Sequence, residues 1–266
     1  MTLALNTLAA ADGPPSPGPA DFELPPVFHL GELGVTKPML LVVLGAVLAF
    51  TFAFLAARPA AVVPGRLQFA GELTYGFVRN SIARDNIGEQ YKKFVPYLFA
   101  VFLFVLINNF YGVIPFFQFP SMSRIGYPIA IAVLTWLIYN TVGMIKHGPI
   151  GYLKHETVPA GVPGWILPLI VPLEFLSNIL VRPITLALRL FATMFAGHLL
   201  LVLFSLGADY LITQYEPTAL GITVGIFSAL LGILVSFLDM LIMFLQAYMI
   251  TLLSAMYIGE AVADHH

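Results

Sequence analysis

The sequence predicts an all-α polytopic membrane protein with five membrane-crossing helices plus a surface amphipathic helix. The last two membrane-crossing helices are expected to form a long, tilted antiparallel hairpin. The first observation is composition: 59% of the residues are hydrophobic and 10% are charged, whereas a soluble domain carries about 25% charged residues. The second is a series of uncharged runs long enough to span a bilayer as helices. The third is the final run, residues 218–259, which is interrupted by only one charge, Asp239.

The chain begins with a polar tail at residues 1–37, which is acidic and rich in proline. We expect residues 11–20 of this tail to be irregular and the whole tail to face outward. No Lys or Arg precedes Lys37, so a cleaved secretory signal is not expected. The rest, residues 38–266, is predicted to form a single membrane domain. Its first span is residues 38–57, where Pro38 suits the first helical turn.

A basic segment follows the first span. Apolar residues recur at helical spacing between residues 66 and 92, together with several Arg and Lys residues. This pattern predicts an amphipathic helix at residues 66–92 that lies on the membrane surface. A helix in a soluble loop explains the same pattern almost equally well.

Four further uncharged or nearly uncharged runs complete the membrane domain: residues 94–115, 125–145, 165–208 and 218–259. We expect a loop at 146–164, and breaks in the 165–208 run at its three prolines. A single helix over the last run measures about 63 Å, twice the hydrocarbon thickness. Because no Gly, Pro or Asn next to Asp239 offers a tight turn, one long helix is preferred over two spans.

The distribution of Lys and Arg predicts the orientation. The segments 58–93 and 146–158 carry eight of the twelve basic residues, and the tail, the turn at Arg124 and the link at 209–217 carry two. Positive charge is enriched in cytoplasmic loops. The sequence therefore predicts an N-terminus outside, a cytoplasmic C-terminus, and a location in the bacterial plasma (inner) membrane.

Arg189 lies in the stretch 182–198, RPITLALRLFATMFAGH, within the most apolar part of the chain. A charge at the bilayer centre costs about 2.5–3.5 kcal/mol on insertion scales. Because residues 190–208 are long enough for a span, Arg189 is also explained as a flanking cation that extends to the interface. Small residues share its helical face: Thr185, Ala192, Thr193 and Ala196. This face favours a fixed positive charge beside a closely approaching partner.

Three further polar residues lie in the last two apolar runs. His198 titrates near neutrality, which suits proton transfer, although a histidine hydrogen-bonded between helices is equally common. Asp239, inside the final run, has to be paired, hydrated or protonated. Gln246 lies on the same helical face as Asp239, and its simplest role is an interhelical hydrogen bond.

The spacing of these residues fits an antiparallel pairing. Arg189 and His198 are about 13 Å apart along a helix, and Gln246 and Asp239 are about 10 Å apart in the opposite chain direction. Arg189 then lies level with Gln246, and His198 level with Asp239. Arg189 and His198 fall on opposite helix faces, so we expect Arg189 to face a partner and His198 an internal, water-filled path. Glu174 either lines a second wet path or is a solvated loop carboxylate.

Other chemistries have little support in the sequence. Cysteine is absent, which excludes disulfides and thiolate metal sites. No Gly-rich phosphate loop is present, and His147 and His155 form only a weak metal signal. No basic cluster indicates a nucleic-acid partner. We therefore expect no cofactor and no metal.

Three ordered stretches carry family-specific motifs. They are LALRLFATMFAGHLL, similar to L-x-L-R-L-F-x-N-M-x-A-G; FLQAYMITLLSAMYI, which contains L-Q-A-[YF]; and FVPYLFAVFLFVLINNFYGVIP, similar to Pro-Tyr-Leu-Phe … Asn-x-x-Gly-x-Ile-Pro. Over roughly residues 64–260 the chain thus resembles subunit a of the F-type proton-translocating ATP synthase. The resemblance implies that the chain is a stator subunit, which offers two offset half-channels to a rotating ring of c subunits.

The resemblance implies roles for individual residues. Arg189 matches the essential arginine that separates the half-channels, and Gln246 matches the glutamine beside it. His198 and Asp239 match a channel-lining pair. Thr193 stands where the family has asparagine, so only channel lining is carried over to it. The implied partners are the c-subunit ring, b-type peripheral stalk subunits, the lipid bilayer and protons. The chain alone is not expected to be an enzyme.

Two other functions fit the polar residues. A stand-alone proton-coupled secondary transporter would use Asp239 as its proton site and would transport a substrate without partners. A membrane enzyme acting on lipids would use His198 with Asp239 and would turn over without a proton gradient. For the channel subunit, protons are expected rather than sodium because histidine is a poor sodium ligand.

Overall fold

The computed structural model describes residues 18, 25–30, 33–58, 65–114, 117, 119–157, 166–214 and 219–263. The strands and α-helices in these ranges are β1 (Pro26–Leu30), β2 (Leu33–Thr36), α2 (Lys37–Ala57), α3 (Arg66–Phe77), α4 (Arg84–Ile87), α5 (Tyr91–Phe110), α6 (Gly126–His147), α7 (Pro149–Thr157), α8 (Leu167–Phe175), α9 (Arg182–Asp209) and α10 (Ala219–Val262). Most of the predicted polar tail, residues 1–37, lies outside the described residues, and so does nearly all of the stretch 11–20 that was expected to be irregular.

The predicted fold class is confirmed. Among the described residues, five helical segments are long and apolar enough to cross a membrane: Lys37–Ala57, Arg66–Phe110, Gly126–His147, Leu167–Ile212 and Gly221–Val262. Many of their large apolar side chains are exposed in the isolated chain. Exposed apolar surface on this scale marks contact with lipid or with other subunits.

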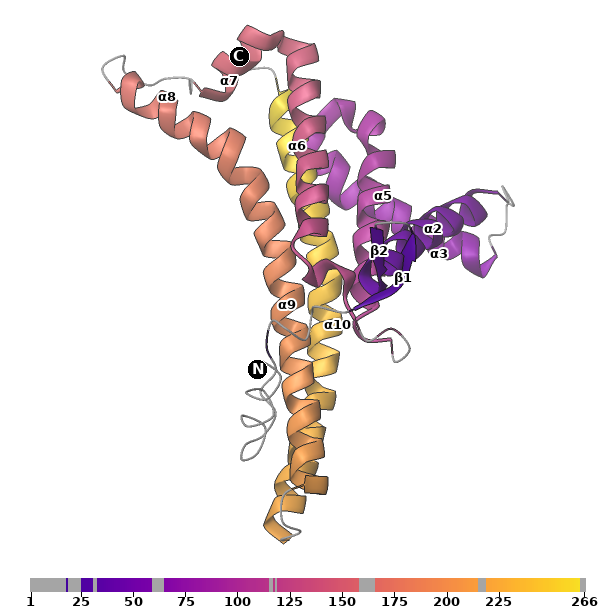
Figure 1. The fold of residues 1–266 in the computed structure, drawn as a ribbon. Coiled ribbons are helices and arrows are strands. Elements are labelled where there is room, and N and C mark those ends of the chain that lie inside the picture. The colour runs from indigo at the N-terminus through magenta and orange to yellow at the C-terminus, as the bar shows by residue number, and fades with distance from the viewer. Residues whose placement is uncertain are drawn as a thin grey trace.

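Helices α9 and α10 form the antiparallel hairpin around which the other helices are arranged (Figure 1). Helix α10 is continuous over 44 residues, or about 66 Å, so one long helix is the correct alternative. The π-helical segment Tyr210–Gln214 follows α9 toward the link between the two helices. This end of the hairpin extends beyond the other helices in Figure 1.

The predicted proline breaks in the 165–208 run are wrong. The chain stays helical from α8 through the π-helical segment Leu176–Val181 into α9, where Pro183 is in the first turn. Because proline has no N–H, Pro183 leaves one carbonyl of the preceding turn without its helical donor. Side chains of α6 donate to two carbonyls of that turn: Trp136 Nε1 donates to Ile179 O at 2.9 Å and Tyr139 Oη donates to Asn178 O at 3.1 Å.

The main hydrophobic core lies where α5, α6 and α9 meet α10. Side chains with almost no exposure come from each of these helices, among them Leu98, Phe102, Leu190, Met194 and Ile250. Helix α2 joins this assembly through α5, where Gly45 lies directly against the buried side chain of Asn108. The polar residues described below are therefore held by a packed scaffold.

The predicted surface helix at 66–92 is helical but not uniform. It comprises α3, the π-helical segment Val78–Ala83, α4, and a short 3₁₀ turn at Gly88–Gln90. Leu73 of the expected apolar stripe is 64% exposed, whereas Gly71 packs against Ala56 of α2. The two helices therefore contact each other through small residues, and an apolar part of α3 is left open.

Two elements were not predicted. Strands β1 and β2 pair as an antiparallel hairpin, with Leu30 opposite Leu33, within the polar tail. Helix α7 occupies part of the expected loop at 146–164, where the ring of Tyr152 lies against Gly143 of α6. Proline and glycine at 146–164 suggested a loop, but the contact with α6 orders this segment.

Candidate proton path

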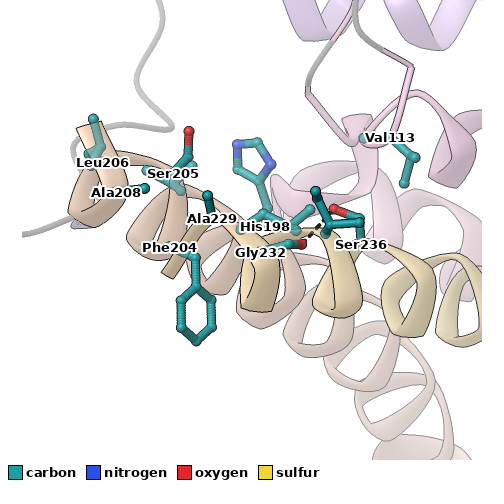
Figure 2. A pocket seen from close by; sticks show the side chains of 13 residues that line it. Val113, His198, Phe204, Ser205, Leu206, Ala208, Ala229, Gly232 and Ser236 are labelled. Carbon is teal, nitrogen blue, oxygen red and sulfur yellow. Dashed lines mark hydrogen bonds between the residues drawn. The ribbon is translucent and has the colours of Figure 1, made fainter. Parts of the chain in front are cut away.

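A cavity of about 640 Å³ lies along the hairpin half that is nearer the link between α9 and α10. Its wall is formed by α9 from His198 to Ala208, by α10 from Ala229 to Ser236, and by the turn after α5 at Gly112 and Val113. Figure 2 shows His198 and Ser236 on neighbouring helices in this wall, with Ser205 nearer the link. The cavity is mostly apolar, with a few polar groups spaced along it.

Asp239 lies next to the inner end of the cavity, one turn beyond Ser236 on α10. Its carboxylate faces Gly197 of α9: a Cβ atom built on Gly197 would lie 2.3 Å from Asp239 Oδ1. His198 follows Gly197 in the chain, and its ring makes an edge contact with Phe119 at 5.8 Å between centroids. The fold thus brings His198 and Asp239 to one level of the hairpin.

Asp239 is only 3% exposed, and its Oδ1 has no hydrogen-bond partner among the described residues. An unsatisfied buried carboxylate oxygen is costly. Such a group requires water or a proton, and a wide, partly polar cavity next to it offers a route for both. These are the properties needed for transfer of a proton at this position.

Arg189 is exposed on α9. Among the described residues, its guanidinium takes part in no ion pair and no side-chain hydrogen bond. Ala192, one turn later on the same face, is also exposed, while Leu190 and Met194 on the opposite face are 1% exposed. The face of α9 that carries Arg189 therefore points away from the core, toward the lipid or the subunit that covers the hairpin.

Gln246 lies at the level of Arg189 but is not exposed with it. Counting about 1.5 Å per residue from the contact of Gly197 with Asp239, Arg189 is about 12 Å along α9 and Gln246 is about 10 Å along α10 in the same direction. Gln246 is 4% exposed, and its Nε2 has no partner in the described part of the chain. The expected register holds, but Gln246 Nε2 donates no hydrogen bond to Arg189.

The hydroxyl of Thr193 is used inside its own helix. Thr193 Oγ1 donates to the carbonyl oxygen of Arg189 at 2.8 Å. This internal hydrogen bond is the usual alternative for a threonine in a helix. Thr193 is therefore close to Arg189 in space but offers no strong donor to the surface.

Glu174 belongs to a separate polar group at the other end of the hairpin, where Arg182 gathers acidic side chains. Asn178 Nδ2 donates to Glu174 Oε2 at 3.1 Å and to the backbone oxygen of Glu156 at 2.8 Å. Arg182 Nη1 lies 2.7 Å from Glu260 Oε2 and 4.0 Å from Glu156 Oε2. Burial raises the pKa of Glu156, and the charge of Arg182 offsets part of this rise.

Two buried asparagines of α5 add to the polar interior. Asn108 and Asn109 have no exposed surface, and Asn108 Nδ2 donates to Phe104 O at 2.8 Å. Asn108 Oδ1 and both amide atoms of Asn109 have no partner in the described part of the chain. Buried amides inside a membrane helix need hydrogen-bond partners, and among these four amide atoms only Asn108 Nδ2 has one in the described part of the chain.

The structure thus separates five of the six predicted site residues into three groups. His198 and Asp239 lie together beside the cavity, Arg189 and Thr193 lie on the open face of α9, and Glu174 lies in the cluster around Arg182. The sixth, Gln246, is buried on α10 at the level of Arg189. Sequence reasoning missed Glu156 and Glu260 as members of that cluster. Only Arg182, a charge at the start of an apolar run, hinted that acidic partners were needed there.

Comparison with known proteins gives consistent matches. A family model described as ATP synthase A chain matches residues 39–259. The chain is 56% identical over 282 residues to ATP synthase subunit a of Nocardioides sp., covering 100% of both chains. It is 44% identical over 269 residues to ATP synthase subunit a of Pseudarthrobacter chlorophenolicus, covering 100% of both. With ATP synthase subunit a of Frankia alni it shares 40% identity over 268 residues, covering 99% of this chain and 91% of the relative.

Proposed function

The chain belongs to the ATP synthase A chain family, and from that premise we propose that it is the stator proton-channel subunit of a rotary ATP synthase. It offers two offset half-channels to a ring of c subunits, and Arg189 separates them. The observation that carries this proposal is the position of Arg189, an exposed arginine without an ion pair among the described residues, on an apolar helix.

Arg189 acts as a fixed positive charge. A guanidinium keeps its proton in proteins, so protons do not pass through it. A carboxylate of the rotor that reaches Arg189 is favoured in its ionised form. The carboxylate therefore gives up its proton on one side of Arg189 and takes up a new one on the other side, which couples proton flow to rotation.

The outer half-channel runs through the cavity at the link end of the hairpin. This assignment is supported by the few basic residues near the link, which favour the outer side of the membrane. Water in the cavity carries protons past Ser236 to His198 and Asp239. These two groups then pass the proton to the rotor.

The second half-channel leads from the Arg189 level toward the opposite end of the hairpin. Glu174 and Asn178 line it, and the charged cluster around Arg182 surrounds its cytoplasmic mouth. The nearby basic residues at 146–158 support a cytoplasmic location for this end. The N-terminal tail is then outside, the C-terminus is cytoplasmic, and α3 with α4 lies on the cytoplasmic membrane surface.

The complete machine requires partners, because a fixed charge without a moving carboxylate does not pump. The partners are the c-subunit ring against the open face of α9 and b-type peripheral stalk subunits that hold the chain still. In a bacterium this assembly lies in the plasma (inner) membrane.

The test is ATP-driven proton pumping by complexes that contain Arg189→Ala. The proposal predicts that pumping falls to background while the complex still assembles, because the rotor carboxylate loses its fixed counter-charge. Arg66→Ala, which removes an exposed arginine outside α9, is the matched control and should pump normally. Pumping at the wild-type rate by Arg189→Ala would refute the gating role.

A further inference from the structure

Gly197 makes an unusual contact on α9. A Cβ atom built on it would lie 2.3 Å from Asp239 Oδ1, 3.1 Å from Asp239 Cγ and 3.5 Å from Asp239 Oδ2. Optimal contacts between non-bonded heavy atoms are about 3.5–4.0 Å for carbon. A residue with a Cβ atom therefore does not fit at position 197 while Asp239 keeps this conformation.

The neighbours of Gly197 differ from those of a glycine that only permits close backbone packing. All three nearest atoms belong to the Asp239 carboxylate. Gly259 on α10 illustrates the packing case, because a Cβ atom there would lie 2.1 Å from the backbone oxygen of Asn86. At Gly197 the missing side chain makes room for one functional group rather than for another helix.

This contact fixes where the Asp239 carboxylate lies relative to the cavity. Asp239 is 3% exposed, and Ser236, three residues earlier on α10, lines the cavity with His198, which follows Gly197. If the carboxylate moved away from Gly197, its separation from His198 and from the cavity would change together. The absence of a side chain at residue 197 thus determines how far the Asp239 carboxylate lies from His198 and from the cavity.

We propose that Gly197 is a positioning residue for proton transfer: it provides the space in which the Asp239 carboxylate lies, close to His198 and to the cavity that His198 lines. This inference rests on the proposed proton path. Gly197 itself exchanges no proton, so its effect on transport passes entirely through Asp239.

The first experiment measures ATP-driven proton pumping and passive proton conduction in membranes with complexes that carry Gly197→Ala. The added methyl displaces the carboxylate by roughly 1 Å, and misplacement of a reacting group by this amount reduces rate by about tenfold to a hundredfold. Because only the end of a side chain has to move, the amount of assembled complex should stay near the wild-type level.

Gly76→Ala is the matched control. It adds the same methyl to a helical glycine of α3, outside the proposed path, where no heavy atom lies within 4 Å of the added Cβ atom. We expect normal pumping from this variant. The pH at which passive conduction is half-maximal should shift in Gly197→Ala and remain unchanged in Gly76→Ala, a difference that altered packing alone does not produce.

A double variant separates positioning from packing. In an Asp239→Ala background, Gly197→Ala should cause no loss of assembled complex, because there is no carboxylate left to displace. A loss of assembly in the double variant relative to Asp239→Ala alone would show a packing role and overturn the inference.

The two proposals fail differently. Normal pumping by Gly197→Ala together with loss of pumping by Asp239→Ala would overturn the positioning role and leave the proposed path intact. Normal pumping by Asp239→Ala would instead contradict the path through Asp239 itself.

Discussion

Two arginines on α9 have the same chemistry and different surroundings. Arg182 forms an ion pair with Glu260 at 2.7 Å, and its guanidinium lies 5.0 Å from the ring centroid of Tyr257. Arg189, about two turns later, is exposed and has no ion pair among the described residues. Arg182 thus stabilises the fold of this chain, whereas Arg189 is available to a partner.

The buried carboxyl group of Glu156 makes the cluster around Arg182 sensitive to pH. Its pKa is raised in the fold by burial, so folding favours its protonated form. This contribution to stability is complete below the ordinary glutamate pKa of about 4.3 and is lost as pH rises through the higher pKa of the folded state. Glu156→Gln should remove this pH-dependent contribution.

The measurement is the thermal stability of the subunit in the detergent-solubilised complex at several pH values. We expect stability to fall less steeply with rising pH in Glu156→Gln than in the wild type. Glu89→Gln, which replaces an exposed carboxylate, should follow the wild-type curve. Identical curves for Glu156→Gln and the wild type would contradict this assignment.

At the scale of elements, α6 compensates for a proline in its neighbour. Pro183 cannot donate a hydrogen bond, and Trp136 with Tyr139 supplies donors to the carbonyls of Ile179 and Asn178. These bonds hold α6 against the π-helical segment before α9. They therefore help to fix the orientation of the helix that carries Arg189.

Trp136→Phe tests this contribution. The variant keeps an aromatic ring but removes the donor to Ile179 O, and a buried carbonyl without a partner costs about 1–3 kcal/mol. We expect a lower thermal unfolding temperature of the complex and a lower yield of assembled complex. Phe227→Leu, at a side chain that is 61% exposed, is the control, and equal losses in both variants would contradict the specific role of the hydrogen bond.

Element lengths were predictable where the sequence lacks turn residues. The absence of Gly, Pro or Asn around Asp239 correctly indicated one long α10. The pairing of β1 with β2 was not predicted from the tail. Helix α7 is ordered by the contact of Tyr152 with Gly143, which local sequence does not reveal.

At the scale of the whole molecule, the hairpin separates two polar regions. The cavity lies along one half of α9 and α10, and the cluster around Arg182 lies at the opposite end. Arg189 lies on α9 between them, with its exposed face turned outward. This offset arrangement supports the proposed rotary mechanism, in which protons enter and leave at different positions around the rotor.

The sequence predicted the residues of this arrangement better than their surroundings. Helical rise alone gave the levels of Arg189 with Gln246 and of His198 with Asp239. The cavity and the contact of Gly197 with Asp239 depend on how two distant segments pack, and so does the pairing of Arg182 with Glu260. Such contacts leave no periodic signal in the chain, and only the three-dimensional structure reveals them.

The central claim is that the Arg189 face of α9 lies against a rotor helix that carries a carboxylate. The chain contains no cysteine, so single cysteines placed on α9 give an unambiguous cross-linking test. Ala192→Cys, one turn from Arg189 on the exposed face, should form a disulfide on oxidation with a cysteine placed one turn from the carboxylate of the c subunit. Ala187→Cys, at a position that is 4% exposed, should not; a cross-link from neither position, or from both equally, in assembled complexes would contradict the account.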